Sequence, residues 1–117
     1  MKVFISSKMT GLKNFGYENF LNKEKELRAL GFDVLNPADI GLKYGFDKPY
    51  AFYIRRSLQM LLQADAVVCF GDYAHSSGSK FEYIVAKVSG IPIFIEKIPK
   101  AIIDIMQVGP LSQTGKS

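Results

Sequence analysis

The stretch Asp65-Ala66-Val67-Val68-Cys69-Phe70 decides the fold, because five apolar residues follow one another directly after a single carboxylate. A strand with water on one face alternates apolar and polar residues, whereas a strand inside a parallel sheet is covered on both faces and reads as a continuous apolar run. The stretch therefore predicts a central strand of a parallel sheet. Parallel neighbours require crossover connections, so we expect helices before and after it.

Apolar residues at helical spacing occur on both sides of this strand. Pro49 suits the first turn of a helix that ends near Gln63, with apolar positions Ala51, Ile54, Leu58, Leu61 and Leu62. After the serine-rich loop at 76–79, a second helix has apolar positions Phe81, Ile84, Val85 and Val88 and stops at Gly90. A further helix starts at Tyr17 and ends before Gly31, and 98–106 could form a last short one.

Three more short runs have strand composition, namely Val3-Phe4-Ile5, Phe32-Asp33-Val34-Leu35 and Ile91-Pro92-Ile93-Phe94-Ile95. Residues 38–48 show no regular pattern, and we expect a loop there that covers a substrate. Strands and helices thus alternate along the chain. This order predicts an α/β fold, a single-domain Rossmann-like (flavodoxin-like) three-layer sandwich around a mainly parallel sheet of four or five strands.

Composition limits the class of protein. The 117 residues are 48% hydrophobic, enough for one domain, which we place at 1–108 with a flexible tail at 109–117. Fifteen basic against eleven acidic residues give a net charge of +4, scattered too widely for a nucleic-acid polymer and compatible with a small anionic substrate. Cys69 and His75 are single, so we expect a buried thiol, no disulfide, no metal and no cofactor. Without a signal peptide or membrane span, we expect a soluble cytoplasmic protein.

Ligands of open α/β sheets bind beyond the carboxyl ends of the strands, which here are followed by hydroxyl-rich loops. Ser6-Ser7-Lys8 follows the first strand, and Ser76-Ser77-Gly78-Ser79 leads into a helix. Hydroxyls, small residues and the N–H groups of a helix N-terminus can together hold a phosphate. The same serines can instead serve only as helix caps. No nucleotide-binding glycine fingerprint is present.

Two carboxylates are candidates for catalysis. Glu82 fits a capping box with Ser79, the interpretation that these residues favour by themselves. Alternatively it is a nucleophile kept ionised by the positive end of a helix. Asp65 is either a turn residue, which the sequence favours, or a second acid of the site. Two carboxylates in unlike surroundings could cleave a glycosidic bond together, one attacking the anomeric carbon and the other assisting the leaving group.

Three segments resemble the nucleoside 2-deoxyribosyltransferase superfamily: Val3 to Gly11, Leu61 to Val68, and Ser76 to Pro92. They are more similar to a branch of short, largely uncharacterised phage and bacterial members and to the nucleoside 5′-monophosphate N-glycosidases. The resemblance implies that Glu82 is the nucleophile that attacks C1′ of the deoxyribose. It also implies that Asp65 helps to position or protonate the departing base.

The resemblance implies a 5′-monophosphate substrate as well. True transferases carry an aspartate six residues before the nucleophile, where it binds the sugar 5′-hydroxyl, and this chain has Ser76 there, as the glycosidase branch does. Ser7 matches a second phosphate-contacting serine. An aspartate often found on the preceding helix is Ser57 here, and Gly-Pro of the usual opening is Ser7-Lys8. Members form dimers or higher homo-oligomers in which a neighbour completes the pocket.

The sequence thus predicts an enzyme that cleaves the N-glycosidic bond of a 2′-deoxynucleoside 5′-monophosphate, with transfer of the sugar to water or to another base. The alternative is a non-catalytic module of the same fold that binds or sequesters a nucleotide. The predicted catalytic residues are Glu82 and Asp65, and the predicted substrate-binding residues are Ser6, Ser7, Lys8, Ser76, Gly78 and Ser79.

Overall fold

The computed structural model describes residues 1–106 of the chain, so the predicted tail at 109–117 lies outside the described residues. Strands and helices alternate as the sequence predicts. The elements are β1 (Lys2–Ser6), η1 (Lys13–Gly16), α1 (Tyr17–Ala29), β2 (Asp33–Leu35), α2 (Ala38–Tyr44), α3 (Tyr50–Leu61), β3 (Ala66–Cys69), η2 (Tyr73–His75), α4 (Ser77–Val88) and β4 (Ile93–Ile95).

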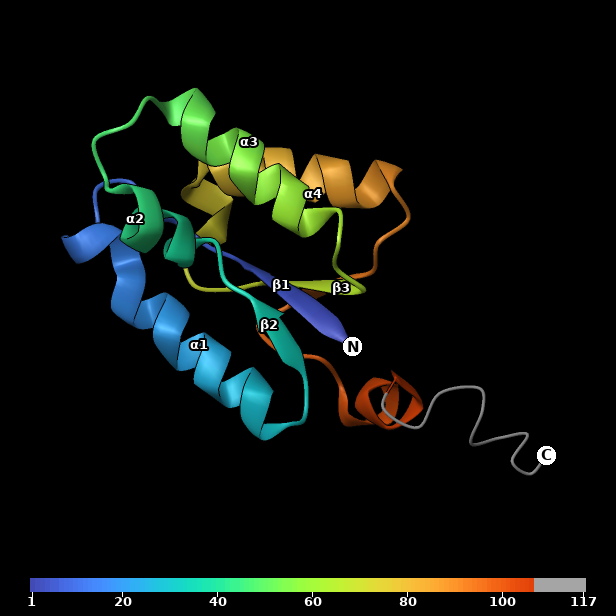
Figure 1. The fold of residues 1–117 in the computed structure, drawn as a ribbon. Coiled ribbons are helices and arrows are strands. Elements are labelled where there is room, and N and C mark those ends of the chain that lie inside the picture. The colour runs from blue at the N-terminus through green and yellow to red at the C-terminus, as the bar shows by residue number, and fades with distance from the viewer. Residues whose placement is uncertain (107–117) are drawn as a thin grey trace.

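The four strands form one parallel sheet in the order β2-β1-β3-β4. In its register Phe4 pairs with Val67, and Val68 pairs with Phe94. Figure 1 shows α1 on one face of the sheet and α3 and α4 together on the other. The predicted Rossmann-like α/β sandwich with a parallel sheet is confirmed, and β3 has a strand on each side.

Alternate residues of the central strands supply the two cores. On one face, Val3, Ile5 and Val68 pack with the buried Phe20 and Leu27 of α1. The other core, under α3 and α4, consists of Phe4, Leu61, Val67, Cys69 and Ala86. Because side chains alternate along a strand, the residue two after Phe4 also points toward α4. That residue is Ser6, a buried polar side chain at the carboxyl end of β1.

The sequence prediction for residues 38–48 was wrong over its first seven positions, which form α2. Asn36 Oδ1 accepts a hydrogen bond of 2.9 Å from the Ala38 N–H, a side-chain turn that leads into this helix, whose N-cap is Pro37. Gly41 is buried beneath the ring of Phe46. Glycine is a weak helix former, and its place here depends on that tertiary contact, which the local pattern does not reveal.

The start of α4 also differs from the sequence prediction. The N-cap is Ser76, whose Oγ accepts a hydrogen bond from the Ser79 N–H at 3.1 Å, so the helix already includes Ser77 and Gly78. The capping box of Ser79 with Glu82 is therefore wrong. Glu82 lies in the second turn of α4, where its side chain is not needed to satisfy the first N–H groups.

Residues 100–106 form a last helical stretch within the predicted 98–106. It follows the buried Ile98, and Ile102 and Ile103 pack against the α1 side of the core. Within residues 1–106, no helix has the length and apolar character needed to cross a bilayer.

Candidate active site

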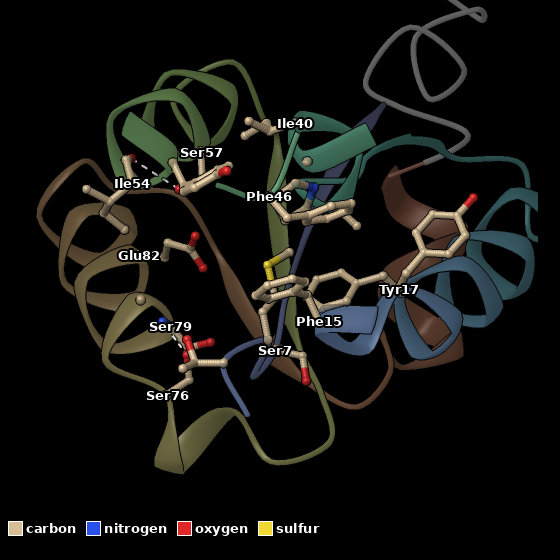
Figure 2. A pocket seen from close by; sticks show the side chains of 18 of the residues that line it. Ser7, Phe15, Tyr17, Ile40, Phe46, Ile54, Ser57, Ser76, Ser79 and Glu82 are labelled. Atoms are coloured by element: carbon tan, nitrogen blue, oxygen red, sulfur yellow. Dashed lines mark hydrogen bonds between the residues drawn. The ribbon is translucent and has the colours of Figure 1, made fainter. Parts of the chain in front are cut away.

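A cavity of about 130 Å³ lies beyond the carboxyl end of β1, between α3 and α4 on one side and the segments around η1 and α2 on the other. Figure 2 shows Glu82 and Ser57 pointing into it from α4 and α3, with Phe15 and Phe46 opposite. This is the edge of the sheet where ligands of open α/β folds bind. The cavity is therefore the candidate active site.

Glu82 is the acidic group of this cavity, with 6% of its surface exposed. Positions three apart on a helix share a face, so Ser79 and Glu82 of α4 both point toward the end of β1. There Ser6 Oγ donates a hydrogen bond of 2.6 Å to Glu82 Oε1. A helix face and a strand end thus fix this carboxylate at one side of the cavity.

Burial raises the pKa of Glu82 from its ordinary value of 4.5 to about 7, while the hydrogen bond from Ser6 and the nearby hydroxyl of Ser57 act in the opposite direction. The sequence prediction that the α4 N-terminus keeps Glu82 ionised is therefore wrong. The influence of a helix terminus falls off within the first turn, whereas Glu82 lies in the second turn and is nearly excluded from water. At neutral pH this carboxyl group exists in both its charged and its neutral form.

Hydroxyl groups continue from Glu82 toward the start of α4. Ser6 Oγ lies 2.9 Å from Ser79 Oγ, and both serines are buried. Ser76 caps the helix and also lines the cavity. The first N–H groups of an α-helix have no acceptor within the helix, so Ser77 and Gly78 present donors next to these hydroxyls. This end of the cavity suits an anionic or hydroxylated part of a ligand.

The structure brings most of the predicted binding residues together and leaves one out. Ser7, Ser76, Gly78 and Ser79 line the cavity, and Ser6 lies directly behind Glu82. Lys8 is not among the described residues that line it. Its Nζ lies 3.8 Å from Asp72 Oδ2, so the prediction that Lys8 contacts substrate is not supported by its placement.

Asp65 lies at the opposite edge of the sheet, so its predicted part in catalysis is wrong. It precedes β3, whereas Glu82 and Ser6 gather where β1 ends. Asp65 Oδ2 accepts a hydrogen bond of 2.8 Å from the N–H of Lys2, the first residue of β1. A strand of four residues separates the two edges by about 13 Å. The alternative that the residues favoured, a turn residue between helix and strand, is the observed one.

An aromatic wall formed by Phe15 and Phe46 faces Glu82. The rings of Phe15 and Phe46 stack with centroids 4.9 Å apart and planes 4° apart. Asn14 and Phe15 have φ values of 51° and 55°, left-handed conformations that non-glycine residues rarely adopt. No local sequence pattern marks Phe15, because its contact with Phe46 joins the loop after β1 to the loop after α2.

Four residues of α3 complete the cavity: Tyr50, Tyr53, Ile54 and Ser57. Tyr53 ties the helix to the preceding loop, since its hydroxyl donates to Gly45 O at 2.6 Å and accepts from the Lys48 N–H at 3.0 Å. Ser57 is buried and donates to Ile54 O at 3.1 Å. The spacing of Ile54 and Leu61 predicted the face of α3 that is buried. Ser57 lies between them on that face, and this position was the sequence signal that it reaches the cavity.

The cavity offers side chains for an organic ligand rather than for a metal ion. Among residues 1–106, no three His, Cys, Asp or Glu side chains gather closely enough to hold one. The predicted buried thiol is confirmed, because Cys69 is buried in β3, and burial followed by the nearby Glu82 raises its pKa to about 11.

Comparisons with known proteins agree with this architecture. A solved structure of a 2-deoxyribosyltransferase from the psychrotolerant bacterium Bacillus psychrosaccharolyticus superposes with a TM-score of 0.64 at 21% sequence identity, over 88% of this chain and 80% of that chain. At that identity the likeness shows a shared fold. A comparison with curated proteins gives no match. The model of one family, described as a domain of unknown function (DUF4406), matches residues 1–95, and the chain therefore belongs to that family.

Proposed function

We propose that this protein cleaves the N-glycosidic bond of a 2′-deoxynucleoside 5′-monophosphate with Glu82 as the nucleophile. One observation carries the proposal: a buried carboxylate, held by Ser6, points into a cavity whose opposite wall is aromatic. Aromatic rings can stack on the planar base of a nucleotide, and the carboxylate can attack the sugar carbon to which that base is attached. The fold shared with a 2-deoxyribosyltransferase and the sequence resemblance support the same chemistry.

The reaction proceeds in two steps. The carboxylate of Glu82 forms a bond to C1′ while the bond from C1′ to the base nitrogen breaks, and the electron pair of that bond leaves with the base, which takes up a proton. Water or another base then attacks C1′ and gives up a proton, and the electron pair of the ester bond returns to Glu82. The first step needs the ionised form of Glu82, so we expect cleavage to increase as the pH rises through about 7.

The phosphate part of the proposal rests on the start of α4. Ser76, Gly78 and Ser79 line the cavity there, beside N–H groups that have no acceptor within the helix. Phosphates bind at helix N-termini because N–H groups and the positive end of the helix both favour negative charge. Ser7, which also lines the cavity, adds a hydroxyl from the loop after β1.

Product analysis by chromatography tests the proposal. Each deoxynucleoside and its 5′-monophosphate is incubated with the wild type, with Glu82→Gln and with Asp65→Asn, the matched change of a carboxylate at the other edge of the sheet. We expect free base from the monophosphates, a loss of roughly 10³-fold or more in Glu82→Gln, and no change in Asp65→Asn. Full activity in Glu82→Gln overturns the mechanism. Tight binding without cleavage supports the nucleotide-binding alternative.

Ser76→Asp tests the phosphate site separately. Aspartate caps a helix as well as serine does, so α4 is retained, but the added carboxylate repels a phosphate. We expect this variant to lose most of its cleavage of monophosphates and to retain whatever cleavage of unphosphorylated nucleosides the wild type shows. An equal loss on both substrate classes argues against a phosphate at this place.

We also propose that the protein forms a homodimer or a higher homo-oligomer. In support, α4 exposes the apolar side chains of Phe81, Ile84 and Val88, the last with 79% of its surface accessible. Sedimentation velocity of the wild type and of Ile84→Glu tests this. We expect an oligomer that dissociates in the variant, and a monomeric wild type overturns this part of the proposal.

A further inference from the structure

The charges around the cavity are unevenly distributed. Glu82 is the acidic residue among the described residues that line it, and none of those residues is Lys, Arg, His or Asp. Two nearby cations are engaged elsewhere. Lys8 lies next to Asp72, and the Arg56 guanidinium stacks over the Phe52 ring with its carbon 3.6 Å from the centroid. The lining is therefore one carboxylate among aromatic, apolar and hydroxyl groups.

Cleavage of an ordinary N-glycoside requires a proton donor, because the base otherwise leaves as an anion. Three tyrosines line the cavity, Tyr17, Tyr50 and Tyr53. The Tyr53 hydroxyl already donates to Gly45 O. The Tyr50 hydroxyl lies 3.5 Å from Ser77 Oγ, and Figure 2 shows the Tyr17 hydroxyl directed away from Glu82. Ser57 donates to Ile54 O.

Glu82 cannot supply that proton while it acts as the nucleophile, because attack requires its ionised form. The buried Cys69 thiol is unsuitable as well, with a pKa of about 11. Within residues 1–106 of one protomer, the cavity thus has a nucleophile and no separate general acid. A substrate whose base leaves without taking up a proton does not need a general acid.

The remaining lining favours a positively charged ring. The faces of Phe15 and Phe46 are electron-rich and attract cations, and the Glu82 carboxylate, where it is ionised, adds a negative charge across the cavity. Little opposes a cation here, because the described lining contains no basic side chain. The lack of a general acid and the negative lining therefore both favour a base that carries a positive charge.

We infer that the preferred substrate is a nucleotide whose glycosylated base already carries a positive charge, such as an N7-alkylated purine or a pyridinium. This inference rests on the proposed function. Glu82 Oε bonds to C1′ as the C1′–N bond breaks, and the bonding pair neutralises the ring, so that the base leaves as a neutral molecule. Water then attacks C1′, the ester electron pair returns to Glu82, and one proton passes to solvent.

The first experiment compares 7-methyl-2′-deoxyguanosine 5′-monophosphate with 2′-deoxyguanosine 5′-monophosphate. The alkylated compound is labile by itself, so the measured quantity is the rate with protein divided by the rate without it. A general acid contributes roughly 10²- to 10⁴-fold, so we expect the alkylated substrate to have the larger acceleration by at least about 10²-fold. Equal accelerations overturn the inference and leave the proposed function standing.

The second experiment supplies the missing acid. The Ser57 hydroxyl interacts with Glu82 and lines the cavity, so Ser57→Asp places a carboxyl group beside the reacting atoms. We expect faster cleavage of the unalkylated nucleotide and no gain on the alkylated one. Ser57→Asn, of similar size but without a proton to give, is the matched control. Melting temperatures identify folded variants, and a folded Ser57→Asp with no gain on the unalkylated nucleotide counts against the inference.

A binding measurement separates the inference from catalysis. The probes are 1-methylnicotinamide, a pyridinium cation, and neutral nicotinamide, titrated calorimetrically into wild type and Glu82→Gln at pH 8. We expect the cation to bind the wild type more tightly by roughly tenfold, and the preference to shrink in Glu82→Gln. If no nucleotide is cleaved but this preference appears, the proposed function fails and the charge selectivity stands. Equal binding of both probes overturns the selectivity.

Discussion

The two edges of the sheet show how position decides what a carboxylate does. At the carboxyl edge, Glu82 is buried, receives a hydrogen bond from Ser6 and has a pKa of about 7. At the amino edge, Asp65 is exposed and accepts one backbone N–H from Lys2. Each residue belongs to or adjoins a regular element, Glu82 in α4 and Asp65 directly before β3. The edge on which they lie, rather than their chemistry, separates a candidate nucleophile from a turn residue.

The largest expected effect concerns stability as a function of pH. The pKa of Glu82 is higher in the folded protein, about 7, than its ordinary value of 4.5. Between these values the unfolded chain binds fewer protons than the folded one, so the free energy of unfolding falls as the pH rises. By the time the pH exceeds 7, the free energy of unfolding has fallen by about 3 kcal/mol in total.

Urea unfolding at pH 4.5 and pH 8 measures this effect. We expect Glu82→Gln to gain about 3 kcal/mol relative to the wild type between the two pH values, since it lacks the titrating group. Asp65→Asn should follow the wild type. If the free energies of unfolding of wild type and Glu82→Gln differ by the same amount at both pH values, Glu82 does not titrate with a raised pKa, and the two edges do not differ in the pKa of their carboxylates.

A smaller effect is expected from Ser6→Ala, which removes the hydrogen bond to Glu82 Oε1. A hydrogen bond to a charged group contributes roughly 1.5–3 kcal/mol, so the pKa of Glu82 should rise by about one to two units. The pH at which kcat/KM increases should rise equally. Ser7→Ala is the matched control, because within residues 1–106 Ser7 lines the cavity without a hydrogen bond to Glu82, and its profile should change in height only. An unmoved profile in Ser6→Ala contradicts the assignment of Glu82 as the titrating group.

Next in size is the cap of α4. Ser76→Ala removes the acceptor for the Ser79 N–H, which should lower the free energy of unfolding by about 1 kcal/mol. Ser76→Asp should retain that stability. Thermal unfolding of both variants checks the cap, and an equal loss in both would show that the Ser76 side chain stabilises the protein in some other way.

The smallest effect is expected at the amino edge. Asp65→Asn keeps an oxygen that can accept from the Lys2 N–H, and the site is exposed, so the free energy of unfolding should change by less than about 0.5 kcal/mol. Chemical denaturation measures it. A loss of several kcal/mol would show that this edge depends on the charge of Asp65.

Much of the fold was predictable because local patterns and topology agree. The apolar run that contains β3 requires cover on both faces, and α1, α3 and α4 provide it. Topology also predicted the cluster of Ser6, Ser76 and Ser79, since parallel strands end at one edge. The aromatic wall was not predictable in this way, because Phe15 and Phe46 meet only after α2 has formed. Asp65 was misplaced because the resemblance was followed although Asp65 stands at the beginning of its strand.

The packing of Gly41 has a consequence for how the family can diversify. A Cβ at this position would lie 2.2 Å from the Phe46 ring, so any other residue must displace a ring that forms part of the cavity wall. A single base change converts any glycine codon to an alanine codon. One mutational step can therefore reshape the Phe46 side of the cavity while Glu82 and its serines stay in place.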